Sequence, residues 1–232
     1  MKHEKWMSAA ELEYQRLLEM LAGLTAQDWQ RPTDCDEWDV RQVLAHLVGG
    51  TESTSSLREL RRLQKRGRKL RPGVDGMNDI EVRERAGTSP SQLLTDLASA
   101  AERGLRARRR IPAPVRVLRI PFGPPLGVRS IGYLMDRVYT RDAWMHRIDI
   151  ARATGRPLML TPEHDGRLVD DIVREWAHVH GRPYDLTLSG AAGGQWSKGP
   201  GGRRLTLDAV QFCRILSGRA AGEDLLAHQV PF

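Results

Sequence analysis

The sequence predicts an α+β protein, with an N-terminal up-and-down four-helix bundle over residues 1–158 and a small C-terminal α/β domain over residues 159–232. Three observations support this prediction. Four stretches before residue 158 place apolar residues at helical spacing, and a proline-rich stretch separates the last two of them. After Pro157 the pattern changes to strand-like alternation with glycine-rich turns. The length of 232 residues suits one medium domain and a smaller one.

The first two helices are expected over residues 6–24 and from Val40 onward. The apolar stripe of the first comprises Leu12, Leu17, Leu18, Leu21 and Leu24. Pro32 then breaks the pattern, and Asp39 is placed to cap the second helix. The apolar face of that helix comprises Val40, Val43, Leu44, Leu47 and Val48.

Residues 66–78 are basic and contain glycine, so they predict a long loop. A third helix is expected from Ser89-Pro90 or Ser91 to Leu105. Five prolines exclude a long helix between residues 111 and 126 and predict a loop with a short extended piece there. They are Pro112, Pro114, Pro121, Pro124 and Pro125. The fourth helix should span residues 130–154 and end at Gly155.

The C-terminal domain is expected to begin with a helix over residues 162–180. A strand over 184–189, a glycine-rich turn and a short strand over 195–198 should follow. A final helix is predicted to start near Thr206.

The net charge of +7 is concentrated in two runs, at residues 61–71 and 103–110. Neither run interleaves aromatic residues for base stacking, so nucleic acid is not an expected partner. We interpret the runs as a solvated basic face with a flexible loop. An anionic small-molecule site and weak nucleic-acid contact are the alternatives.

Targeting and redox features favour a cytoplasmic protein, monomeric or homodimeric. No apolar run approaches the about 20 residues that cross a bilayer, and the first residues lack the apolar centre of a secretory signal. Cys35 and Cys213 are too few for a disulfide framework, and we expect both to be reduced.

A candidate metal site emerges on the fourth helix. Asp142 and His146 lie four residues apart, about 40° around a helix axis, and Asp149 falls about 20° to the other side of Asp142. The face that they share is otherwise apolar, and buried charges are costly unless they are paired or bound to a metal. His46 on the second helix, followed by two glycines, is the leading third ligand. Three ligands would leave one position open, as in catalytic sites, with Asp149 in a supporting role.

The alternative is a structural one. An Asp-x-x-x-His pair is common by chance and usually forms a helix-surface hydrogen bond, and a lone histidine such as His46 is more often a boundary residue without a ligand. Spacing alone does not decide between the two interpretations.

Three ordered motifs resemble one family. Residues 32–50, PTDCDEWDVRQVLAHLVGG, and residues 141–157, RDAWMHRIDIARATGRP, resemble the two motifs of mycothiol-dependent maleylpyruvate isomerases and related DinB-like metal-binding bundles. The C-terminal segments LSGAAGGQW, FCRILSGRAAG and VPF are similar to the small domain that follows the bundle there. One departure is the aspartate at position 142, where the isomerase has glutamate.

The resemblance implies that His46, Asp142 and His146 bind a divalent metal, with zinc the first candidate and nickel, iron or cobalt possible. It implies an enzyme that activates mycothiol or another small thiol for addition to a small electrophile, as a cis–trans isomerase or an S-transferase. Arg219 matches a family arginine that could bind a substrate carboxylate, the alternative being a salt bridge to Glu223 or Asp224. Cys35 matches a motif cysteine that we interpret as a packing residue. The competing function is a metal-binding sensor or accessory protein without turnover.

Overall fold

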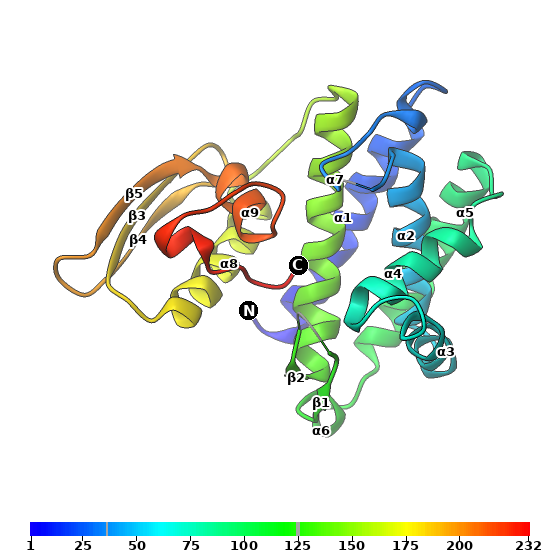
Figure 1. Cartoon of the computed structure of the whole chain (residues 1–232), viewed down its shortest axis with the longest axis horizontal. Helices are drawn as coiled ribbons and strands as arrows, with labels where there is room; N and C mark the ends of the chain where they lie inside the picture. The colour runs from blue at the N-terminus through cyan, green and yellow to red at the C-terminus, as the bar shows by residue number, and fades with distance from the viewer. Residues whose placement is uncertain (36, 124–125) are drawn as a thin grey trace. The chain divides into compact units, whose positions relative to one another are not determined.

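The structure is a computed structural model that describes residues 1–35, 37–123 and 126–232. It divides into two compact units. The bundle unit comprises Met1–Pro157 with Phe232, and the C-terminal unit comprises Leu158–Pro231. The first is helical apart from a short two-stranded ribbon, and the second contains a three-stranded sheet (Figure 1). The fold class is therefore α+β, as the sequence predicts.

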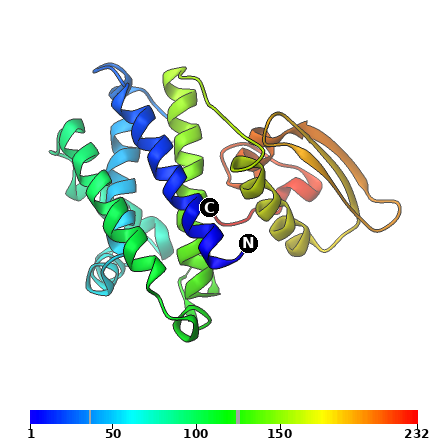
Figure 2. The same ribbon diagram turned by 180° about the vertical axis from the view of Figure 1, so that it is seen from behind.

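Four long helices build the bundle unit: α1 His3–Ala22, α2 Val40–Ser53, α5 Pro90–Arg109 and α7 Tyr139–Thr154. Helix α1 packs against α5 and α7, and α2 packs against the same two helices, so the four form a ring (Figures 1 and 2). Their apolar faces meet in one core, which includes Leu17, Leu21, Val43, Leu44, Leu47, Leu93, Leu97 and Ile150.

Local signals in the sequence set the ends of these helices. Asp39 accepts a hydrogen bond from the Gln42 backbone N–H while the Gln42 side chain accepts one from the Asp39 N–H, a capping box at the start of α2. Ser89 caps α5, with Pro90 in its first turn. Gly155, at φ 67°, ends α7. The short 3₁₀ helix η1, Asp28–Gln30, lies between α1 and α2.

The loop predicted over residues 66–78 is wrong for most of its length. The chain forms α3, Leu57–Gly67, and α4, Gly73–Glu84, with a short turn between them. Glycine allows the two helices to approach closely, because a Cβ added to Gly67 would lie 2.6 Å from the backbone carbon of Gly76. Helix α4 also packs against α2, which brings its side chains toward the bundle.

The segment between α5 and α7 contains the predicted extended piece. A single turn α6, Ala113–Arg116, precedes strands β1, Arg119–Pro121, and β2, Val128–Ser130, which pair antiparallel. Pro124 and Pro125, two of the prolines behind the prediction, lie outside the described residues. The fourth helix differs from the prediction at its start, because a π-helix, η2 Tyr133–Val138, leads into α7.

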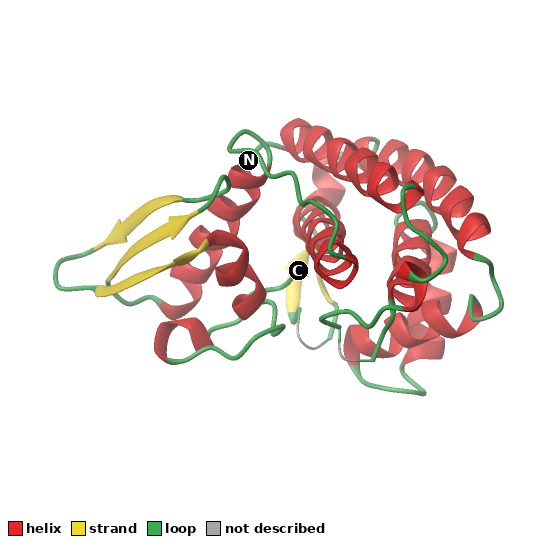
Figure 3. Cartoon of the chain, turned by 90° about the horizontal axis from the view of Figure 1, so that it is seen from above, coloured by secondary structure: helices red, strands yellow, loops and turns green. Residues whose placement is uncertain are grey.

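The C-terminal unit consists of α8 Asp165–His180, β3 Tyr184–Ser189, β4 Gly194–Lys198, β5 Arg203–Asp208, α9 Ala209–Leu216 and the 3₁₀ helix η3 Asp224–Ala227. The sheet has the order β4-β3-β5, with β3 antiparallel to β4 and parallel to β5 (Figure 3). The predicted final helix starts later than expected, at Ala209. Residues before it form β5, whose apolar residues alternate, and Asp208 then caps α9.

The described helices include none that is both long and apolar enough to cross a bilayer.

Candidate metal centre

The packing of α2 against α7 brings the three predicted ligands together. His46 Nε2 lies 3.5 Å and His146 Nε2 lies 3.3 Å from the same oxygen, Asp142 Oδ1. One nitrogen or oxygen atom from each residue lies within 4.8 Å of the other two, a spacing that one cation could bridge. Both imidazoles are buried, whereas the Asp142 side chain is 24% exposed. The cluster is therefore accessible on the side of Asp142.

Each imidazole is held by a second carboxylate at its other ring nitrogen. His46 Nδ1 lies 2.7 Å from Glu81 Oε2, and His146 Nδ1 lies 3.0 Å from Asp149 Oδ2. A carboxylate at Nδ1 fixes the ring and the tautomer so that Nε2 presents its lone pair to a metal. The two Nε2 atoms both face Asp142, so the donor set and its supporting contacts fit a divalent cation. The assignment of these residues as metal ligands stays a prediction.

The charges of the cluster are strongly coupled. Burial would lower the pKa of His46, but the carboxylates of Asp142 and Glu81 outweigh it and raise this pKa to about 9. For His146, Asp142 likewise outweighs burial and raises the pKa well above its ordinary value. Burial opposes ionisation of Asp142, yet the two imidazoles hold its pKa below the usual range. In the absence of a metal, the carboxylates around the two rings therefore favour the protonated form of both imidazoles.

Trp38 and Cys35 line the same cluster. The Trp38 ring centroid is 5.1 Å from that of His46 and 6.5 Å from that of His146, so the indole forms an apolar wall beside both ligands. Cys35, interpreted from the sequence as a packing residue, is half-buried, with its Sγ 3.5 Å from Asp149 Oδ2. Its thiol therefore contacts the carboxylate that holds His146.

Comparison with known proteins decides the family. The profile of the mycothiol maleylpyruvate isomerase N-terminal domain matches residues 10–151, more than half of the chain. The chain belongs to this family. No curated protein matches it significantly.

Two solved structures are similar in fold to this chain. One is a crystal structure of the mycothiol-dependent maleylpyruvate isomerase, with a TM-score of 0.62 and 15% sequence identity. The other is a histidine-to-alanine mutant of that isomerase, with the same TM-score and 14% identity. Each comparison covers 95% of this chain and 91% of the other. At this identity the likeness establishes the fold alone, for both units of the chain.

The sequence did not point to Glu81, the carboxylate that holds His46 in the candidate metal centre. It lies on α4, within the stretch next to the predicted loop, and its side chain is buried. A single glutamate between Ile80 and Val82 carries no sequence signal of its own. A helical interpretation of residues 73–84, which places Glu81 on the same face as buried apolar residues, could have identified it.

Replacing Glu81 with alanine is expected to weaken metal binding by about 10–100-fold, the usual cost of removing the partner of a ligating histidine. The Nδ1 of His46 would lose its acceptor, and the ring would be free to turn. Competition with a chromogenic chelator measures the affinity. Glu81→Gln is the matched control, because it keeps the side-chain size and a hydrogen-bond acceptor, and it should lose less. Equal affinity in Glu81→Ala and the native protein would contradict the positioning role.

Gly49 lets α4 approach α2 closely enough for the Glu81–His46 contact. A Cβ at Gly49 would lie 2.6 Å from Glu81 Cγ, whereas a Cβ at Gly50 would meet nothing nearer than 3.9 Å. Gly49→Ala is expected to cost about 1–3 kcal/mol of stability through overpacking. Gly50→Ala should be neutral or stabilising by up to about 1 kcal/mol, because alanine is the better helix former. Urea unfolding compares the two, and similar midpoints would refute this reading of the α2–α4 contact.

Arg219 lies in the C-terminal unit, just after α9, and is half-buried. Its backbone N–H donates to the Arg214 carbonyl at 2.8 Å. Asp224, one of the acidic partners considered for it, forms ion pairs with Arg182 and Arg203. The role of Arg219 in substrate binding stays a prediction.

Proposed function

We propose that this chain is a metal-dependent enzyme that activates a low-molecular-weight thiol, mycothiol or a similar one, for addition to a small electrophile. The reaction is a maleylpyruvate-type cis–trans isomerisation or an S-transfer. The observation that supports the proposal most is the convergence of two imidazole Nε2 atoms and one partly exposed carboxylate in a chain of the maleylpyruvate isomerase family.

The residues of the site have distinct tasks in this proposal. His46, Asp142 and His146 hold a divalent cation, zinc first among the candidates and nickel, iron or cobalt also suited to mixed imidazole and carboxylate donors. When bound, such a cation acts as a Lewis acid that lowers the pKa of a thiol at its open position. Glu81 and Asp149 keep the two imidazoles in orientation. Trp38 shields one side from water, and the exposed edge of Asp142 marks the side from which a thiol enters.

Arg219 is proposed to bind a carboxylate of the electrophile, because guanidinium and carboxylate form two parallel hydrogen bonds. The partners are thus a small thiol and a small electrophile in the cytoplasm, without nucleic acid. The protein is proposed to act as a monomer or a homodimer.

A thiol titration of the metal-loaded protein tests the function. Cobalt is the best probe, because a thiolate ligand adds an intense charge-transfer absorption that water does not give. We expect one equivalent of metal, and a new absorption band on addition of mycothiol. Conversion of maleylpyruvate, or loss of free thiol to an electrophile, then separates isomerase from S-transferase. Stoichiometric metal without any response to thiol would favour the sensor or accessory protein, and absence of metal would overturn the proposal.

Metal affinity should rise with pH from about 6.5 to about 9, the interval between the ordinary pKa of histidine and that of His46 in the fold. A cation must displace the protons of both imidazoles, and the cost of this displacement falls as pH approaches the raised pKa. Calorimetry in buffers of different ionisation enthalpy measures the protons released. An affinity independent of pH over this interval would contradict the displacement of protons from the histidines by the metal.

A further inference from the structure

The segment from the last two turns of α5 to the start of η2 combines positive charge with exposed aliphatic side chains. Residues 103–135 contain no aspartate or glutamate and eight arginines: Arg103, Arg106, Arg108, Arg109, Arg110, Arg116, Arg119 and Arg129. One of them, Arg108, is buried, and three pair with acidic residues elsewhere, namely Arg106 with Glu102, Arg109 with Glu11 and Arg116 with Asp136. Within the described part of the chain the other four form no salt bridge.

Exposed apolar residues gather in the same segment. Val117 is 71%, Leu118 53% and Val128 50% exposed, and Val115 on α6 is also exposed. They are held close to the cations, because Arg119 and Arg129 both donate to the Val128 carbonyl at 3.2 Å. The β1–β2 pairing and the Ile131 N–H to Leu118 carbonyl bond tie the strands together. Helix α6 and the ribbon thus place exposed aliphatic side chains next to two arginines, Arg119 and Arg129, for which the described residues supply no salt-bridge partner.

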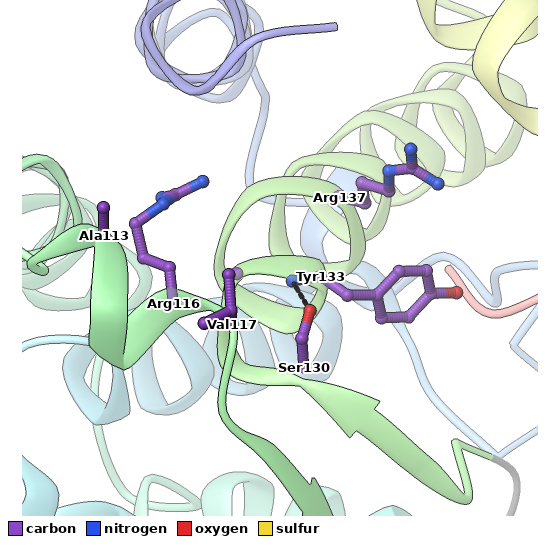
Figure 4. Close-up of a pocket in the computed structure, with 7 residues that line it drawn as sticks. Ala113, Arg116, Val117, Ser130, Tyr133 and Arg137 are labelled. Atoms are coloured by element: carbon purple, nitrogen blue, oxygen red, sulfur yellow. Dashed lines mark hydrogen bonds between the residues drawn. The ribbon is translucent and has the colours of Figure 1, made fainter.

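A shallow recess of about 450 Å³ adjoins this ribbon. Figure 4 shows it between α6, the end of β2 and η2, with the Ser130 hydroxyl accepting a hydrogen bond from the Tyr133 N–H. It is lined by Ala113, Arg116, Val117, Ser130, Gly132, Tyr133 and Arg137. The lining of the recess includes the exposed Val117, the Ser130 hydroxyl and the Arg137 guanidinium, whereas the Arg116 guanidinium is paired with Asp136.

We propose that α6 and the β1–β2 ribbon form a docking surface for an anionic lipid bilayer. Arginines near an anionic surface gain attraction from the surface potential, and small aliphatic side chains gain by entering the boundary between headgroups and acyl chains. The surface satisfies both requirements at once. Phosphate of a headgroup is the group that the recess and the arginines would meet.

Nucleic acid fits this surface less well. The phosphates of a duplex or a single strand would attract the arginines. Valine and leucine side chains, however, do not stack on bases, so these exposed side chains would contribute nothing to nucleic-acid binding. Helix α3 is also basic, but two of its arginines, Arg62 and Arg66, are already paired with Glu84.

Vesicle flotation of the full chain tests the proposal. We expect the protein to float with vesicles of phosphatidylcholine mixed with phosphatidylglycerol, to stay behind with phosphatidylcholine alone, and to dissociate as salt is raised. Arg119→Gln combined with Arg129→Gln should lower the partition constant by about fivefold for each arginine removed. Val117→Ser combined with Leu118→Ser should lower it as well, without changing the salt dependence.

Leu57→Ser combined with Arg58→Gln on α3 is the matched control, because both residues are exposed there and the variant should bind like the native protein. Circular dichroism confirms that each variant is folded. Failure of the native protein to float, or equal flotation of ribbon variants and native protein, would overturn the proposal. So would binding of an oligonucleotide or of polyglutamate through the ribbon without binding to vesicles. The metal content is measured in parallel, so that a failure here is distinct from a failure of the proposed activity.

Discussion

Replacement of His46 with alanine is expected to abolish stoichiometric metal binding. Two donors, Asp142 and His146, would remain, and both come from one helix, so no second element would close the site. The loss should exceed the about 10–100-fold expected for Glu81→Ala, because a ligand rather than its supporting carboxylate is removed. Metal analysis after gel filtration, followed by chelator competition, measures it.

The matched control for His46→Ala is His178→Ala, which removes an exposed histidine near the end of α8. It should leave metal content unchanged. The metal-free fold of His46→Ala should persist, because burial already raises the pKa of Glu81 and this carboxyl can take a proton when the imidazole is gone. Full metal content in His46→Ala would show that the cation, if present, is bound elsewhere.

The long helices of the bundle could be predicted because their local and long-range signals agree. The capping box at Asp39, Pro90 after Ser89 and Gly155 mark helix ends, and apolar residues between them recur on one face. The neighbouring positions of His46 and the Asp142–His146 pair also followed from helix-face geometry together with an ordered set of motifs.

Helix α3 could not be predicted in the same way, because its many charged residues give no sign of the contacts that it makes in the fold. Only three of its positions are aliphatic, Leu57, Leu60 and Leu63, and of these Leu60 and Leu63 are buried. Basic residues between them resemble a solvated loop. The helix is stabilised instead by tertiary packing on α4, through the contact of Gly67 with Gly76, which no local propensity shows.

Glu81 was not identified because α4 was not predicted, and dependence on long-range contacts is the reason that neither α4 nor β5 was predicted. The residues of both segments take their structure from partners distant in sequence: Glu81 from His46, and the β5 leucines from pairing with β3. Register with a distant strand overrides the weak helical pattern that begins near Thr206. Long-range contacts, rather than propensities, therefore decide the parts of this chain that the sequence left open.

Trp176→Ala should destabilise the C-terminal unit by about 3–5 kcal/mol, the cost of removing a fully buried tryptophan. The Trp176 ring lies at the centre of an aromatic cluster, with centroids 5.0 Å from Tyr184 and 5.3 Å from Phe212, and its Nε1–H donates to the Leu225 carbonyl at 2.9 Å. Truncation would leave a cavity between α8, β3 and α9 and an unpaired carbonyl on η3.

Trp196→Ala is the matched comparison, since this indole also donates to an acceptor, Asp170 Oδ1 at 2.9 Å, but is only half-buried. Trp196→Ala should lower the free energy of unfolding clearly less than Trp176→Ala, because folding removes less apolar surface of Trp196 than of Trp176 from water. Urea unfolding followed by far-ultraviolet circular dichroism compares the two, and equal costs would contradict the central place of Trp176. Metal binding should survive in folded Trp176→Ala, because the proposed ligands and the carboxylates that hold them all belong to the bundle unit. Retained metal with a weakened C-terminal unit would therefore separate the stability of the sheet from the chemistry of the bundle.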